Sequence, residues 1–318
     1  MSSELSNSIK AEAIGLGFTA CGIAKAEPVD NFTAQKVMRW LAQGDYAGMA
    51  YMNNYTDKRL DPRLLMPEVK SIVCVALNYA PARTLPEGEY QFAAYALGKD
   101  YHDIVKAKLH RLAAIFGFEN YRAFCDSAPV LERYWAERAG LGWTGRNHQL
   151  IIPKAGSMFF LGELFLDVEL EYDRPQVSKC GRCHACIDAC PTQAILPDRE
   201  FDAEKCLSYQ TIENRGELTD AFACKMGNTI YGCDRCQQAC PWNRFATPNT
   251  TPELQPNEAL LGMTKERWHN LSEEEYRQIF KGSAVKRAKY AGLMRNIQAA
   301  NKHQEETGNE YTDEQQHS

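Results

Sequence analysis

Two runs of cysteines in the middle of the chain have the spacing of iron–sulfur ligands. The first run, CxxCxxCxxxCP, extends from Cys180 to Pro191, and the second, CxxCxxxCP, extends from Cys233 to Pro241, with Cys206 between them. In the first pattern, three thiolates bind one [4Fe–4S] cube and the fourth crosses to a neighbouring cube. This part of the chain is therefore expected to hold clusters that carry electrons.

The second run lacks the first cysteine of the pattern. The residue three positions before Cys233 is Ile230, which cannot be a ligand, so Cys206 is the expected substitute. The expected ligands of cluster 1 are Cys180, Cys183, Cys186 and Cys240, and those of cluster 2 are Cys190, Cys206, Cys233 and Cys236. Two CxxC pairs could instead form a zinc site. Zinc does not require the CxxCxxCxxxCP order, so two [4Fe–4S] clusters are favoured.

The composition predicts a globular protein with more than one domain. The chain has 318 residues, of which 44% are hydrophobic and 10% aromatic, enough for two or three domains. It has 12 cysteines, and the ligand spacing within the two runs favours a reducing cytosol over disulfides. The sequence shows no signal peptide, twin arginine or membrane span, so we expect a soluble cytoplasmic protein. The net charge of −5 gives no overall attraction to nucleic acid.

Strands and helices are expected to alternate before the cysteine runs. The predicted helices are 2–16, 30–43, 100–116 and 127–139, and the predicted strands are 18–24, 71–78, 121–125, 149–152 and 158–166. Such alternation predicts an α/β or α+β domain. The expected divisions are a catalytic domain over 1–175, the cluster module over 176–245, a helical tail over 246–303 and a disordered acidic segment over 304–318.

No nicotinamide-binding motif accompanies the clusters. The segment from Gly140 to Gly145 has GxGxxG spacing but follows a predicted helix rather than a strand, which is the wrong context for that motif. A non-enzymatic electron carrier or a zinc-stabilised scaffold would not need the large first domain. We therefore expect an enzyme whose first domain uses the electrons at another kind of redox centre.

Several motifs together resemble one family along almost the whole chain. They are DKR at Asp57, GKDYH at Gly98, DSAPVLER at Asp126, AERAGLGW at Ala136 followed by GRN at Gly145, GNTIYGCDRC at Gly227 and VKRAKY at Val285. With the paired cysteine runs, these motifs closely resemble the epoxyqueuosine reductases. Each motif alone is modest, but their combination is specific.

The resemblance implies reduction of epoxyqueuosine to queuosine at the wobble position of the tRNA anticodon loop, the final step of queuosine biosynthesis. It implies cobalamin and two [4Fe–4S] clusters as cofactors, a nitroreductase-like cobalamin domain, a bacterial ferredoxin-type module and a truncated HEAT-like tail. The cobalamin is expected to bind base-off without a protein histidine. Indeed, Val105 stands where the DxHxxG signature beginning at Asp100 would need glycine. A monomer served by an unidentified low-potential electron donor is expected.

The resemblance also implies roles for individual residues. Asp126 is the expected proton donor to the departing oxygen, with a pKa raised by burial beside the corrin; its alternative is a helix cap. The expected cobalamin contacts are Arg59, Asp126, Asn147, Leu150, Ser208, Gln210, Asp234 and Arg235. Tyr101 is a further candidate for lining the pocket.

A basic segment near the end of the sequence is the candidate RNA surface. Residues 281–303 contain no acidic side chain, although an ordinary solvated helix would look similar. The expected tRNA contacts are Arg133, Arg215, Lys225, Lys281, Lys286, Arg287, Lys289 and Arg295. Phosphate contacts of this kind would weaken steeply with salt. The competing function is that of a cobalamin-dependent reductive dehalogenase acting on a small molecule, but those enzymes usually carry the twin-arginine signal that this sequence lacks.

Overall fold

A four-stranded antiparallel sheet is the centre of the first part of the protein. The computed structural model describes residues 2–196 and 200–316. The strand order is β1-β2-β7-β4, and every neighbouring pair is antiparallel. The strands are β1 (Ala20–Lys25), β2 (Ser71–Asn78), β4 (Tyr121–Phe124) and β7 (Phe159–Leu166). This part of the predicted α/β or α+β architecture is therefore of the α+β kind.

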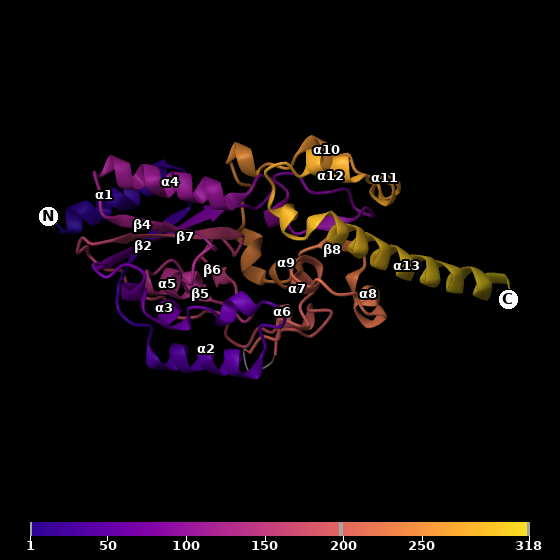
Figure 1. Cartoon of the computed structure of the whole chain (residues 1–318), viewed down its shortest axis with the longest axis horizontal. Coiled ribbons are helices and arrows are strands. Elements are labelled where there is room, and N and C mark those ends of the chain that lie inside the picture. The colour runs from indigo at the N-terminus through magenta and orange to yellow at the C-terminus, as the bar shows by residue number, and fades with distance from the viewer. Residues whose placement is uncertain (1, 197–199, 317–318) are drawn as a thin grey trace.

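Helices cover both faces of this sheet (Figure 1). Helices α1 (Ser2–Gly15) and α4 (Tyr101–Ile115) pack on one face, and α5 (Glu132–Arg138) packs on the other. Successive residues of β2 alternate between the two cores, with Val73 on the α4 side and Ile72 on the α5 side. Because both faces are covered, β2 reads as the nearly continuous apolar run seen in the sequence.

Shorter elements surround this sandwich. They are α2 (Asn31–Gln43), η1 (Ala50–Asn53), α3 (Thr56–Leu60), η2 (Pro62–Leu64), and the hairpin of β5 (Trp143–Thr144) and β6 (Leu150–Ile151). The strand predicted at 149–152 thus pairs with β5 rather than with β7. The helix predicted from residue 127 begins only at Glu132, since Pro129 disfavours helical geometry in the residue before it.

The cysteine runs form a module of short elements that leads into a helical tail. The module contains α6 (Ala185–Asp188), α7 (Leu207–Ile212), α8 (Asp220–Met226), β8 (Thr229–Tyr231), α9 (Arg235–Gln238) and η4 (Pro241–Phe245). The tail contains η5 (Pro252–Leu254), α10 (Glu258–Leu261), α11 (Lys265–His269), α12 (Glu273–Ile279), η6 (Ala284–Arg287) and α13 (Lys289–Gln316). None of the described helices has the length and apolar character needed to cross a membrane.

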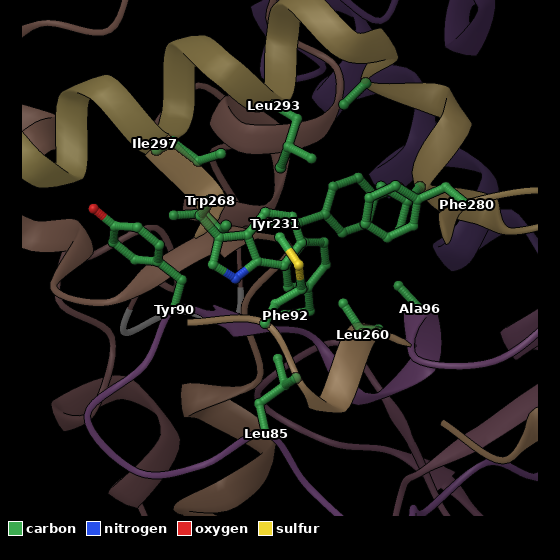
Figure 2. Close-up of a cluster of buried hydrophobic side chains, with 14 of the residues drawn as sticks. Leu85, Tyr90, Phe92, Ala96, Tyr231, Leu260, Trp268, Phe280, Leu293 and Ile297 are labelled. Carbon is green, nitrogen blue, oxygen red and sulfur yellow. The ribbon is translucent and has the colours of Figure 1, made fainter. Parts of the chain in front are cut away.

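A third hydrophobic core joins the tail to residues 85–97. Strand β3 (Gln91–Phe92) pairs in parallel with β8, and η3 (Ala94–Ala96) follows it. Phe92 lies against Tyr231, Trp268 and Phe280, with ring centroids 5.4–5.7 Å apart (Figure 2). The segment 85–97 therefore packs with the module and tail, which differs from the division expected at residue 175.

The end of the chain also differs from the expectation. The basic segment is not one helix, because Lys289 has a positive φ of 62° and separates η6 from α13. The backbone of α13 continues to Gln316, where we predicted disorder over 304–318. Residues 317–318 lie outside the described residues. In Figure 1, α13 extends away from the body of the molecule toward the C-terminus.

Candidate active site

The first set of predicted cluster ligands lines one cavity. Cys180, Cys183, Cys186 and Cys240 border a space of about 160 Å³. Burial raises the pKa of the Cys186 thiol, and the neighbouring Cys240, Cys180 and Cys183 raise it further. In the described residues, no three His, Cys, Asp or Glu side chains are arranged to hold a single metal ion. The cavity, at about 160 Å³, is far larger than one ion.

The second set is gathered in the same way. Burial raises the pKa of Cys236, and Cys233, Cys206 and Cys190 add to that effect. Cys206 is the N-cap residue of α7, which brings it to the second run although it lies far from Cys233 in sequence. The structure therefore groups Cys206 with the three cysteines with which the sequence paired it.

Asp126 follows β4 and is held by neighbours from two elements. Its φ of 55° lies in the left-handed region, which residues other than glycine rarely adopt. Tyr101 donates its hydroxyl hydrogen to Asp126 Oδ2, and His102 Nε2 lies 3.6 Å from the same oxygen. The Asp126 backbone N–H donates to Glu132 Oε1. The carboxyl of Asp126 is nevertheless 59% exposed, so it faces an open part of the site.

The pKa of Asp126 moves opposite to our expectation. Burial by the surrounding protein raises it, but hydrogen bonds from His102 and Tyr101 outweigh burial and hold the pKa below its usual value. Asp100 and then Asp126 raise the pKa of His102 to about 9. The prediction of a raised pKa for Asp126 is wrong for this structure, and the raised pKa of His102 favours a proton on the imidazole at neutral pH.

Arg59 and Asn147, two of the expected cobalamin contacts, are buried polar residues. Arg59 is 8% exposed, and its Nε has no hydrogen-bond partner among the described residues. Burial lowers the pKa of Arg59, and the neighbouring Tyr51 opposes this shift. Asn147 lines the first cysteine cavity, and its Nδ2 donates to the Cys236 carbonyl at 3.4 Å. Leu150 is instead a core residue packed on the α5 side of the sheet.

The other expected cobalamin contacts have partners inside the module. Gln210 donates to the Glu204 carbonyl at 2.6 Å, and Arg235 donates to the carbonyls of Lys225 and Met226. Asp234 accepts the Ala94 N–H at 2.6 Å, and burial raises its pKa to about 6. Ser208 is half-buried. These contacts hold the cluster loops together.

The cations predicted to contact tRNA fall into two groups. The first group consists of three arginines that bond within the protein. Arg295 donates to the carbonyls of residues 210, 214 and 216, and Arg215 donates to those of residues 287 and 288. Arg287 forms an ion pair with Glu213. The remaining side chains are exposed, namely Arg133, Lys225, Lys281, Lys286 and Lys289. Lys286 and Lys289 border a surface hollow of about 360 Å³ together with Tyr276, Arg277, Tyr290 and Glu273.

Two features of the site escaped the sequence analysis. His102 was assigned only to a helix start, which it does occupy, since Asp100 caps α4 through the His102 N–H. Its contact with Asp126 depends on the packing of α4 beside β4. The other feature is the carboxyl pair of Glu132 and Glu163. The signal for it was present, because Glu163 is the single charged residue in the apolar run of β7.

Comparisons with known proteins agree with this geometry. A family described as "Epoxyqueuosine reductase QueG, DUF1730" matches residues 59–127, and one described as "4Fe-4S double cluster binding domain" matches residues 179–243. The epoxyqueuosine reductase of Cellulophaga algicola is 46% identical over 92% of this chain and 96% of its own. That of Leadbetterella byssophila is 47% identical over 92% and 97%.

A solved structure shows the same fold. The crystal structure of an epoxyqueuosine reductase with an epoxyqueuosine-modified tRNA stem loop superposes with a TM-score of 0.86 at 29% identity, covering 94% of this chain and 81% of that one. The Streptococcus thermophilus enzyme gives 0.84 at 28% identity, with coverages of 94% and 81%. On these matches, the protein is an oxidoreductase, and the chain belongs to the epoxyqueuosine reductase family.

Proposed function

We propose that this protein reduces epoxyqueuosine in tRNA to queuosine. The reaction takes two electrons and two protons, breaks the epoxide C–O bonds and releases the oxygen as water. One observation carries the proposal: two cysteine quartets, each suited to a four-iron cluster, accompany an exposed acid site at Asp126 in a member of this family. The wobble base of the anticodon loop is the proposed target.

The quartets would supply the electrons. Four thiolates hold a [4Fe–4S] cluster, which carries one electron at a time. Two clusters in one module can therefore accept electrons singly from a low-potential donor, whose identity is open, and pass them on to the reaction site. The lower the solvent access to each cluster, the more its potential depends on the hydrogen bonds to its sulfurs.

Two buried polar side chains, Arg59 and Asn147, are compatible with a bound cobalamin. The buried Arg59 Nε lacks a partner among the described residues and could donate to a corrin amide, as could the Asn147 side chain. Bound cobalamin would supply the cobalt chemistry that acts on the epoxide carbon. Both ring nitrogens of His102 already face carboxylates, Asp100 at 2.6 Å and Asp126 at 3.6 Å, which supports base-off binding without a histidine ligand.

His102, Asp126 and Tyr101 would deliver the proton. With its pKa raised to about 9, the imidazole stores a proton at neutral pH. That proton can move from Nε2 to the Asp126 carboxylate and from there to the departing oxygen. Asp126 thus stays the proposed donor, while His102 keeps it supplied. Efficient acid catalysis needs a donor group whose pKa lies near the working pH. The pKa of Asp126 alone is low, and His102 supplies a group that still holds a proton at neutral pH.

The exposed cations of the tail would hold the RNA. Lys286 and Lys289 border the hollow that two tyrosines also line, and Lys281 is an exposed lysine of the same tail. Lysines neutralise phosphates, and aromatic rings stack on unpaired bases of RNA loops. Arg133, next to Asp126 by its electrostatic influence, is placed to contact the substrate near the reacting base.

The decisive test uses anaerobically purified protein loaded with iron, sulfide and cobalamin. We would add a chemical reductant and tRNA containing epoxyqueuosine, and then measure the nucleoside mass after digestion. Loss of one oxygen, abolished by Asp126→Asn with cobalamin still bound, would establish the reaction. A chain carrying about eight irons (two four-iron clusters) and cobalamin but giving no conversion would overturn the tRNA assignment and favour a small-molecule reductase.

A further inference from the structure

Glu163 is an acidic residue in a place that disfavours charge. It lies in the middle of β7, opposite Cys74 of β2 and Phe124 of β4, and its side chain is 0% exposed. Neither of its carboxyl oxygens has a hydrogen-bond partner among the described residues. A buried carboxylate without a donor is strongly unfavourable, so this side chain requires a proton or a neighbour that brings one.

The neighbour is a second carboxyl group, that of Glu132. Glu132 is the first residue of α5, the helix that covers this face of the sheet. Burial, followed by the charge of Glu132, raises the pKa of Glu163, and burial, followed by the charge of Asp126, raises that of Glu132. Glu163 is buried and Glu132 is half-buried, and two carboxyls that share such a site do not both ionise at neutral pH. One proton between them supplies the donor that Glu163 lacks.

The same pair reaches Asp126 through the backbone. Glu132 Oε1 accepts the Asp126 N–H, while Asp126 holds its left-handed φ of 55°. The other titratable groups facing the pair are Cys74 of β2, Cys125 at the end of β4 and Arg133 of α5. Of these, Arg133 alone is cationic; its side chain is exposed, and its charge lowers the pKa of Glu132 by less than burial and Asp126 raise it.

We infer that Glu132 and Glu163 share one proton and together position the Asp126 loop: Glu163 donates the shared hydrogen to Glu132, whose Oε1 accepts the Asp126 N–H. Glu132 and Glu163 are positioning residues that touch no substrate atom. Their importance for catalysis rests on the proposed role of Asp126, but the shared proton itself does not. Losing that proton would leave two buried charges together and push Glu132, with the Asp126 loop, away from the sheet.

The shared proton can be tested without measuring activity. Infrared spectra of the cluster-loaded wild-type protein at about pH 8, where ordinary carboxyls are ionised, should show the C=O band of a buried protonated carboxyl. Glu163→Gln should remove that band. Its absence from the wild type, or its persistence in the variant, would overturn the inference.

The pH dependence of stability gives a second readout. A carboxyl whose folded pKa is raised keeps its proton in the folded state and releases it on unfolding, so stability falls as pH rises above the unfolded pKa of about 4.3. The Tm of the wild type should therefore fall more steeply between about pH 5 and pH 8 than that of Glu163→Gln. Parallel curves would contradict the shared proton.

The positioning role needs a pair of substitutions. The amide of Glu163→Gln can still donate to Glu132, so most of the turnover should remain, whereas Glu163→Leu should lower kcat about 10- to 100-fold with little change in KM for tRNA. Leu161→Val, on the same face of β7, is the matched control for a core change and should keep kcat. Equal losses in Gln and Leu variants that are folded and cluster-loaded would overturn the positioning role. If Asp126→Asn is active, the proposed donor fails, while the infrared result stands by itself.

Discussion

At the scale of single residues, the chemistry of this protein depends on how three side chains share a proton. Asp126 is exposed yet receives hydrogen bonds from Tyr101 and His102, both at the start of α4. An exposed carboxyl can reach a substrate, and a cationic neighbour can reload it. On the proposed mechanism, Asp126 delivers the proton and His102 stores it.

Replacing Asp126 tests the delivery step. Asp126→Asn keeps the size of the side chain and removes its acidity, so kcat should fall about 10²- to 10⁴-fold, the usual contribution of a general acid. Iron content and cobalamin binding should stay as in the wild type. Asp103 is an exposed aspartate on α4. Asp103→Asn is the control and should keep full activity. A kcat of Asp126→Asn within a factor of three of the wild type would exclude Asp126 as donor.

Replacing His102 tests the storage step through the pH profile. The proton is needed for turnover and is lost as pH rises through the pKa of the group that holds it. For His102 this pKa is about 9, so wild-type kcat should decline only near that pH. In His102→Gln, the carboxyl alone must hold the proton, and the decline should move by more than one pH unit to lower pH. An unchanged profile would show that another group stores the proton.

The raised pKa of His102 also makes the stability of the folded protein depend on pH. The folded pKa of His102 lies above its unfolded value of about 6.5, so its contribution is complete below that pH and is lost as pH rises through about 9. The Tm of the wild type should therefore be lower at about pH 9 than at about pH 6.5. The His102→Gln variant should lack this part of the decrease.

At the scale of elements, the site depends on how the tail meets the start of α4. Lys99 donates its N–H to the Glu253 carbonyl at 2.8 Å, and Asp100 donates its N–H to the Gly282 carbonyl at 2.7 Å. These backbone bonds lie directly before Tyr101 and His102. The tail therefore supports the helix end that carries the proton-storing residues.

Gly98 allows this close approach. A Cβ at Gly98 would lie 2.6 Å from the Cα and carbonyl carbon of Leu254, which are backbone atoms and cannot move aside alone. Gly98→Ala should lower the free energy of unfolding by about 1–3 kcal/mol, as overpacking does, and also lower kcat by displacing His102. Gly15→Ala, where no atom lies within 4 Å, is the control. Denaturant unfolding would check both, and equal stability of the two variants would contradict the argument.

Local patterns predicted some of these elements well and others poorly. The apolar run of β2 and the glycine that ends α2 at Gly44 were sufficient signals. The start of α5 was misplaced, because the sequence shows Pro129 but not the hydrogen bond that holds Asp126 in a left-handed conformation. That bond depends on tertiary packing, as does the low pKa of Asp126.

At the scale of the whole molecule, the two cores of the sheet and the core of the tail are joined by a segment that local patterns could not place. Strand β3 has two residues, and its partner β8 lies in the cluster module. A pairing so short and so distant in sequence leaves no periodic signal. The cysteine quartets were easier to predict, because ligand spacing is fixed by the cluster rather than by the fold. The hydrogen-bond and ion-pair partners of Arg287 and Arg295 could not be predicted, because they are distant in sequence and are brought close only by the tertiary fold.

Those internal partners separate the arginines of the tail from its lysines and lead to a prediction about RNA binding. Lys286 and Lys289 are exposed and border the hollow beside Tyr276 and Tyr290, so their charges can release counterions from RNA phosphates. The double variant Lys286→Ala/Lys289→Ala should weaken binding of a tRNA stem loop and reduce the slope of log K against log salt by about one unit for each lysine. Lys70→Ala, an exposed lysine at the start of β2, should leave the slope unchanged. If the double variant binds with the wild-type slope, the RNA must lie on another face of the protein.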